Sequence, residues 1–166
     1  EDAFAMRVLT LNTWQERGPW ERRWELILEG LRIYSPDVAC FQELFNRDWA
    51  GEVRKKTGLA MLVFPKIPCG LVILTKYPVL DSGERELFKS PRENYSRGLL
   101  WAELEDPRGR ILVLCTHLSW MPEDGESRKR QLAGILAFLR EKGPRSRVLI
   151  AGDFNAAPDS AEIRWF

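Results

Sequence analysis

The chain has 166 residues, of which 45% are hydrophobic and 30% are charged, the proportions of an ordinary globular protein. This length suits a single domain with a sizeable core. The formal net charge of +1 excludes the overall basic surplus that marks many nucleic-acid-binding proteins, so only local basic patches remain for such a role.

Hydrophobic periodicity predicts strands mixed with amphipathic helices along the chain. We expect strands at residues 7–11, 38–41, 59–64, 71–75, 79–87, 99–104, 111–115 and 148–151. We expect helices at residues 20–34, 46–57 and 127–142, and the start of another at residues 160–166. Residues 105–109 have the Asp, Pro and Gly content of a hairpin turn. No linker or repeat interrupts this pattern, which indicates one α/β domain over residues 1–166, a sandwich with a mixed sheet.

The cysteines and the chain start bear on the cellular compartment. Cys40, Cys69 and Cys115 form no C-x-x-C pair, and we interpret them as small buried hydrophobic residues. No apolar run approaches the roughly 18 residues of a transmembrane helix, and no signal segment opens the chain. A cytoplasmic location is the default expectation, and it becomes open if residues 1–5 are what remains after a signal peptide was removed.

Polar side chains follow four of the expected strands. Asn12, Glu43 and His117 each come directly after an apolar run, and the run at residues 148–151 leads through a glycine to Asp153 and Asn155. Each has an ordinary structural alternative: a turn for the amides and Asp153, a solvated loop for Glu43, a hydrogen-bonded structural role for His117. Four independent strands that end in complementary groups favour a polar site at the strand ends.

Several segments resemble the endonuclease/exonuclease/phosphatase family, the deoxyribonuclease-like metal-dependent phosphohydrolases. They are LTLNTW (residues 9–14), PDVACFQE (36–43), GLVILTKYP (70–78), THL (116–118) and GDFN (152–155), with Arg128 and Gln131 at the start of a helix. They occur in the family's order across nearly the whole chain. The resemblance implies a four-layered α/β/β/α sandwich with the site at one edge of two facing sheets.

The resemblance also implies a role for each strand-end residue in a Mg²⁺-dependent hydrolase, a phosphodiesterase, nuclease or phosphatase. Glu43, with Asn12 beside it, would bind Mg²⁺, with Mn²⁺ as an alternative ion. Asp153 would orient or help deprotonate the attacking water, and Asn155 would donate a hydrogen bond to charge that builds on the phosphorus oxygens. His117 would contact the phosphate or protonate the leaving group. The alternative function is a non-catalytic binding or regulatory module that retains the scaffold.

The sequence departs from the family pattern near its C-terminus. The family carries a further Asp followed by His there, and the single histidine of this chain already matches the earlier position. We therefore expect these 166 residues to be the N-terminal and central part of the domain, without its C-terminal strands. A missing C-terminal part or a second chain would complete the site, and the 166 residues alone are expected to show weak or absent hydrolysis.

The substrate class stays open: nucleic acid, phospholipid and small phosphodiesters all occur in the family, and the fold does not choose. Basic residues near the expected site either grip phosphates or form a solvated face; they are Arg92, Arg97, Arg128, Lys129 and Arg130. Trp14, Trp20 and Trp120 lie in or near strand-end loops, where an indole can stack on a base or enter a lipid surface. Trp20 is more readily explained as core-facing.

Overall fold

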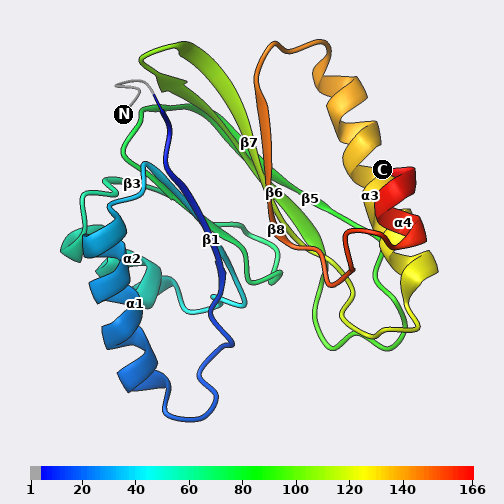
Figure 1. Cartoon of the computed structure of the whole chain (residues 1–166), viewed down its shortest axis with the longest axis horizontal. Helices are drawn as coiled ribbons and strands as arrows, with labels where there is room; N and C mark the ends of the chain where they lie inside the picture. Colours follow the sequence, from blue (N-terminus) through cyan, green and yellow to red (C-terminus); the bar gives the residue numbers. More distant parts are fainter. Residues whose placement is uncertain (1–4) are drawn as a thin grey trace.

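Two four-stranded β-sheets face each other in the computed structural model, which describes residues 5–166 (Figure 1). The strands are β1 (Val8–Asn12), β2 (Val38–Gln42), β3 (Met61–Val63), β4 (Val72–Thr75), β5 (Val79–Glu86), β6 (Gly98–Asp106), β7 (Gly109–His117) and β8 (Val148–Asp153). The helices are α1 (Trp20–Tyr34), α2 (Arg47–Lys56), α3 (Gly125–Lys142) and α4 (Ala161–Trp165). Residues 1–4, which belong to the segment before Met6, lie outside the described part of the chain.

The first sheet has the strand order β1-β2-β4-β3. β1 runs parallel to β2, while β4 is antiparallel to both β2 and β3. Every residue of β2 is buried, because α1 and α2 cover its outer face and the second sheet covers its inner face. The side chain of Asn46 caps α2 by accepting hydrogen bonds from the N–H groups of Asp48 and Trp49. α1 ends at Ser35, whose left-handed backbone (φ 42°) stops the helix.

The second sheet has the order β5-β6-β7-β8 and is antiparallel except for its last pair, since β7 and β8 are parallel. A tight turn at residues 107–108 joins β6 to β7, as the hairpin prediction required. The long helix α3 carries the chain from β7 back to the start of β8, so both strands end at the same edge of the sheet.

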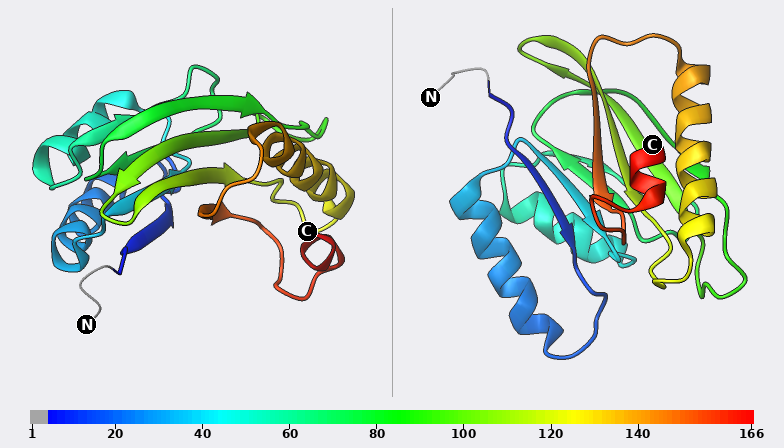
Figure 2. Two further views of the ribbon diagram at one scale, coloured as in Figure 1. Left: turned by 90° about the horizontal axis from the view of Figure 1, so that it is seen from above. Right: turned by 45° about the vertical axis from the view of Figure 1, so that its right-hand side comes forward.

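The elements form four layers, with helices outside and two sheets inside (Figure 2). One apolar cluster fills the space between the sheets, a second lies under α1 and α2, and a third lies under α3 and α4. The prediction of an α/β/β/α sandwich is therefore confirmed. Cys40, Cys69 and Cys115 are all buried and unbridged, as predicted.

Most element boundaries agree with the sequence prediction to within a few residues. The helix over residues 20–34 is as predicted, whereas β3 is shorter and β6 and β7 are longer. On α3, Phe138 is buried and Leu136 is only partly buried. The bulky Phe138 ring packs against Trp101 of β6, with the ring centroids 5.7 Å apart. In residues 5–166 no helix combines the length and apolar character needed to cross a membrane.

β1 and β8 are the end strands of their sheets and lie side by side across the sandwich. Val8 and Val148 at their starts are 40% and 42% exposed. Because each of these strands is parallel to its neighbour, their carboxyl ends point to the same end of the molecule as those of β2 and β7. This arrangement brings the polar groups that follow the four strands together.

Candidate functional site

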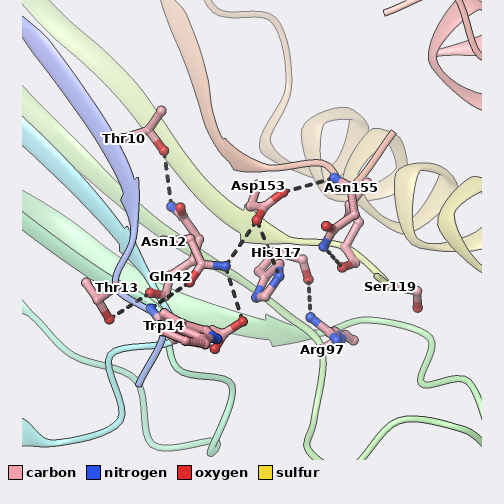
Figure 3. A network of polar contacts seen from close by, with 12 residues as sticks. Thr10, Asn12, Thr13, Trp14, Gln42, Arg97, His117, Ser119, Asp153 and Asn155 are labelled. Atoms are coloured by element: carbon pink, nitrogen blue, oxygen red, sulfur yellow. Dashed lines mark hydrogen bonds and ion pairs between the residues drawn. The ribbon is translucent and has the colours of Figure 1, made fainter. Parts of the chain in front are cut away.

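The residues predicted from the strand ends are brought together at one edge of the sandwich: Figure 3 shows Asn12, His117, Asp153 and Asn155, and Glu43 is hydrogen-bonded to Asn12. The amide Nδ2 of Asn12 donates a hydrogen bond to Glu43 Oε1 at 3.2 Å and another to Asp153 Oδ2 at 3.1 Å. His117 Nε2 lies 3.8 Å from the same Asp153 oxygen. Asn155 donates its backbone N–H to Asp153 Oδ1 at 3.1 Å and its side-chain amide to the carbonyl of Leu118. Two carboxylates thus lie on either side of one amide group.

Two of these residues adopt a left-handed backbone at the point where their strand ends. The φ angles are 56° for Glu43 and 48° for Asn155. Non-glycine residues in this region are uncommon and store strain, which is found mainly where the surrounding contacts compensate for it. The bond from Asn155 N–H to Asp153 is the Asx-type turn that the sequence left as an alternative. The turn and the site coexist, because Asp153 Oδ2 still faces Asn12.

His117 is a buried, neutral imidazole. Its side chain is 3% exposed. Burial, followed by the positive charge of Arg97, lowers the pKa of His117 to about 4, against the opposing effects of Asp153, Glu43 and Glu93. Its Nδ1 has no hydrogen-bond partner among residues 5–166. A neutral ring at pH 7 offers one N–H donor and one acceptor nitrogen.

A buried ion pair that the sequence did not predict lies behind His117. Glu93 and Arg97 form a salt bridge whose side chains are only 2% and 1% exposed. Arg97 also donates to the backbone carbonyl of His117 at 3.4 Å, and its guanidinium lies 4.6 Å from the ring centroid of Tyr95. Burial raises the pKa of Tyr95 to about 12, so its hydroxyl stays protonated. The sequence gives no periodic signal for this pair, because residues 92–97 form a polar segment without a strand or helix pattern directly before β6.

Two of the basic residues expected on the surface are buried instead. Arg97 faces Glu93, and Arg128 is 4% exposed and pairs with Glu162 at 2.7 Å. Burial contradicts the alternative of a solvated face for these two arginines, whereas the alternative of a phosphate contact stays a prediction. Each guanidinium has a carboxylate partner and also donates to backbone carbonyl groups. A buried arginine with such partners is stable in the interior.

A cavity of about 350 Å³ opens over these groups. Its lining residues come from the loops after β1, β2, β7 and β8 and from the segment before β6; they are Asn12, Trp14, Gln15, Arg17, Glu43, Glu93, Asn94, Tyr95, His117, Trp120 and Asn155. Gln15, which the sequence analysis did not single out, donates to Glu43 Oε2 at 3.1 Å. Both oxygens of Glu43 therefore have amide neighbours. The cavity is large enough for a phosphate group with one attached substituent.

The donor set restricts which metal ion the site could hold. Within residues 5–166, no three or more His, Cys, Asp and Glu side chains are grouped to enclose a metal. The amide of Asn12 lies between the carboxylates of Glu43 and Asp153, with its nitrogen 3.2 and 3.1 Å from an oxygen of each. An all-oxygen site with few protein ligands suits a hard ion that keeps waters and binds substrate phosphates. This fits the predicted ligand pair and does not fit a structural zinc site.

The sequence profile of the Endonuclease/Exonuclease/phosphatase family matches residues 9–166. The chain belongs to this family. It is 26% identical over 167 residues to Protein angel of Drosophila melanogaster, covering 88% of this chain and 46% of that protein. It is 25% identical over 175 residues to YbhP of Escherichia coli strain K12, covering 92% of this chain and 67% of YbhP. Tyrosyl-DNA phosphodiesterase 2 of Danio rerio is 26% identical over 127 residues, covering 75% and 34%. The chain thus spans about half the length of Protein angel and two thirds of the length of YbhP.

Solved structures show the same fold at lower sequence identity. A β-hairpin deletion mutant of β toxin from Staphylococcus aureus superposes with a TM-score of 0.81 at 18% identity, over 97% of this chain and 71% of the toxin. ANGEL2, described as a 2′,3′-cyclic phosphatase, gives 0.77 at 23% identity, over 96% and 56%. A further β toxin structure contains bound magnesium ions. These likenesses establish the fold, and the family match establishes kinship with phosphoester hydrolases.

Proposed function

We propose that this domain hydrolyses phosphoric ester bonds with the help of Mg²⁺ or Mn²⁺. The observation that carries the proposal is the amide of Asn12, which joins the carboxylates of Glu43 and Asp153 at 3.2 and 3.1 Å beside a neutral His117. Ordinary packing does not need two acids held this close to each other at the mouth of a cavity, since like charges repel. The activities named for two similar proteins, a tyrosyl-DNA phosphodiesterase and a 2′,3′-cyclic phosphatase, support the same reaction class.

Glu43 and Asn12 would hold the metal ion. The Asn12 oxygen accepts the backbone N–H of Trp14 at 2.9 Å, and a bound cation would share this oxygen through its second lone pair. When bound, the ion supplies positive charge against the phosphoryl oxygens and the leaving oxygen. Gln15 keeps the Glu43 carboxylate in place from the other side, through its bond to Oε2.

Asp153 is the acceptor for a proton of the attacking water. The N–H of Asn155 and the amide of Asn12 hold the two oxygens of this carboxylate in a fixed orientation. A positioned carboxylate of this kind orients the water and assists its deprotonation. The side-chain amide of Asn155 has a second N–H besides the one bonded to Leu118, and we assign it to the charge that develops on phosphorus-bound oxygen.

His117 donates a hydrogen bond to the phosphate rather than a proton to the leaving group. Because burial keeps its pKa near 4, the imidazolium form is scarce at pH 7. A neutral ring retains one N–H, which suits a contact to a phosphate oxygen. The ring lies in the cavity wall with Asn12 and Glu43, where such a contact is available.

The cavity favours small phosphoesters over long nucleic acids. Among the described residues that line it, Arg17 is the single basic side chain, while Glu43 and Glu93 are acidic. Enzymes that grip a polyanion neutralise several phosphates with Lys and Arg, and their affinity is strongly salt-dependent. We expect turnover of a small diester to change little between low and physiological ionic strength.

The test is hydrolysis of bis(p-nitrophenyl) phosphate, a diester, and p-nitrophenyl phosphate, a monoester, with and without Mg²⁺ or Mn²⁺. We expect these 166 residues to give weak, metal-dependent release of p-nitrophenol, with a loss of about 100-fold or more in Glu43→Gln and unchanged activity in Glu21→Gln, a control acid in the first turn of α1. Calorimetry should show weaker Mg²⁺ binding in Glu43→Gln only. Full activity of Glu43→Gln would refute the metal assignment. If the protein bound phosphate but hydrolysed neither compound in the presence of Mg²⁺ or Mn²⁺, this would instead favour the non-catalytic module.

A further inference from the structure

Two exposed tryptophans border the cavity that contains Glu43 and His117. Trp14 lies in the loop between β1 and α1 and is 51% exposed, and Trp120 lies in the loop between β7 and α3 and is 56% exposed. Both line the 350 Å³ cavity. Large indoles with half their surface in water lose the free energy that burial would supply. Their position calls for an explanation other than packing.

Trp14 is held in place by an arginine of α1. Trp14 and Gln15 both adopt the left-handed backbone, with φ 57° and 52°. The guanidinium of Arg23 donates hydrogen bonds to the carbonyls of four loop residues: Thr13 at 3.1 Å, Trp14 at 3.5 Å, Gln15 at 3.0 Å and Arg17 at 2.9 Å. Its central carbon lies 5.2 Å from the centroid of the Trp14 ring. These contacts compensate the strain of two consecutive left-handed residues.

Trp120 is held in the same way by an arginine of α3. Arg128 donates to the carbonyls of Ser119 at 3.1 Å, Met121 at 2.7 Å and Pro122 at 3.1 Å, so both neighbours of Trp120 are fixed. Gln131 accepts the backbone N–H of Ser119 at 2.9 Å and donates to its hydroxyl. Each tryptophan therefore projects from a loop whose backbone is tied to the following helix, and it is pre-organised before any ligand arrives.

The surroundings indicate what such a pair of rings would contact. Apart from the two tryptophans, Arg17, Tyr95 and His117, the side chains that line the cavity are amides and acids, so the surface lacks the aliphatic and strongly basic character that a lipid bilayer favours. Among the described residues that line the cavity, Arg17 is the single cationic side chain, so apart from a bound metal ion Coulomb attraction gives a phosphate group little affinity. Aromatic stacking is a further source of binding energy, and it is substantial for nucleobases.

We propose that Trp14 and Trp120 form a stacking site for the nucleobase of a small nucleoside phosphoester whose phosphate occupies the Asn12–Glu43–His117 site. Arg23 and Arg128 act as positioning residues for the two rings. The inference rests on the proposed function, because the phosphate site fixes where the base can lie. It adds a substrate class that the reaction chemistry alone does not select.

The experiment compares binding of deoxythymidine 5′-phosphate and 2-deoxyribose 5-phosphate, measured by calorimetry in Mg²⁺. The two compounds share the phosphate and sugar and differ in the base. We expect the nucleotide to bind wild type at least about tenfold more tightly. Trp14→Ala and Trp120→Ala should each remove most of this difference and leave the sugar phosphate unaffected, while Trp14→Phe should retain part of it.

Trp165→Ala is the matched control. Trp165 is 46% exposed and also has a cation over its ring, Lys129 Nζ at 5.5 Å, but it lies on α4 and lines none of this cavity. The Trp165→Ala variant should bind both compounds as tightly as wild type does. Arg23→Lys keeps a positive charge and loses the planar set of donors, so it should reduce the discrimination in favour of the nucleotide without changing affinity for the sugar phosphate.

Each outcome decides between named alternatives. Equal binding of the two compounds to wild type would overturn the stacking site and leave the phosphate site standing. Failure of both compounds to bind would overturn the proposed hydrolase site and the stacking site with it. Trp14-dependent binding to phosphatidylcholine vesicles without nucleotide discrimination would show that the indoles contact lipid, and the inference would be wrong. A folded, thermally stable Trp14→Ala variant with unchanged discrimination would also refute it.

Discussion

His117 Nε2 lies 3.8 Å from Asp153 Oδ2, although the two residues are direct register partners on the parallel strands β7 and β8. This separation exceeds a hydrogen bond. Because burial keeps the pKa of His117 near 4, the pair at pH 7 consists of a neutral ring and an acid rather than an ion pair. The ring is therefore free to contact a third group in the cavity.

This buried histidine makes the stability of the fold depend on pH. Unfolded His117 takes up a proton near pH 6.5, whereas the folded protein resists protonation until about pH 4. The stabilisation is complete above pH 6.5 and is lost as the pH falls towards 4. Between pH 7.5 and 5.0 we expect the free energy of unfolding of wild type to fall by about 2 kcal/mol through this group. Urea unfolding at constant ionic strength measures it, and His117→Gln should show a shallower dependence. An identical slope in the variant would contradict the assignment.

The salt bridge between Glu93 and Arg97 should be sensitive to the loss of one partner. Both side chains are almost fully buried. Arg97→Met leaves a buried carboxylate without its counter-ion, and we expect it to lower the free energy of unfolding by about 3–5 kcal/mol. The double variant Glu93→Leu with Arg97→Met should regain much of that loss, because it removes both charges. Glu52→Ala breaks an exposed pair with Lys55 on α2 and should leave chemical denaturation unchanged. Equal losses in the single and double variants would point to packing instead of charge.

Gly152 should tolerate no side chain. Its φ is 152°, and a Cβ there would lie 2.0 Å from the backbone oxygen of Thr116 on the paired strand. We expect Gly152→Ala to destabilise the protein by about 3 kcal/mol or more and to disturb the neighbouring Asp153. Gly30 is the control: it lies in α1 with open space around it, so Gly30→Ala should stabilise by about 0.5–1 kcal/mol. Thermal unfolding of the two variants should therefore move in opposite directions.

Asn155 should affect turnover far more than substrate binding. Removal of its amide is expected to lower kcat by about 100- to 1000-fold in bis(p-nitrophenyl) phosphate hydrolysis, with little change in KM. Asn155→Gly keeps the left-handed backbone (φ 48°) without strain, while Asn155→Ala adds strain. Both should lose activity to a similar extent, and Asn155→Gly should remain as stable as wild type. A wild-type rate in Asn155→Gly would reject the role.

The sequence predicted those parts of the site that follow regular strands. Asn12, Glu43, His117 and Asp153 each follow an apolar run, and Gly152 marks where the last of these strands ends. Because side chains alternate along an extended chain, Asp153 and Asn155 could be expected to face the same way. Glu93 and Tyr95 lie in a segment without periodicity, so no pattern indicated that they face His117. A buried arginine such as Arg97 is invisible in the same way, because charged residues are normally exposed and its partner is recognisable only in three dimensions.

The shape of the loop after β1 also lay beyond sequence reasoning. Left-handed residues are usually signalled by Gly or Asn, yet here Trp14 and Gln15 adopt that conformation because Arg23 binds the loop carbonyls. The pairing of β2 with β4 is likewise set by which apolar faces meet, not by any local signal.

The hydrogen bond from Asn12 to Asp153 spans 141 positions of the chain. As the polypeptide leaves the ribosome, β1 and β2 can pair with their helices long before β8 has been made. Glu43 and Asn12 then await a partner that β8 supplies, and a nascent chain without β8 has no paired carboxylates. Under the proposed function, hydrolysis would therefore begin only after β8 has been made, and its onset would report that β1 and β8 have come together.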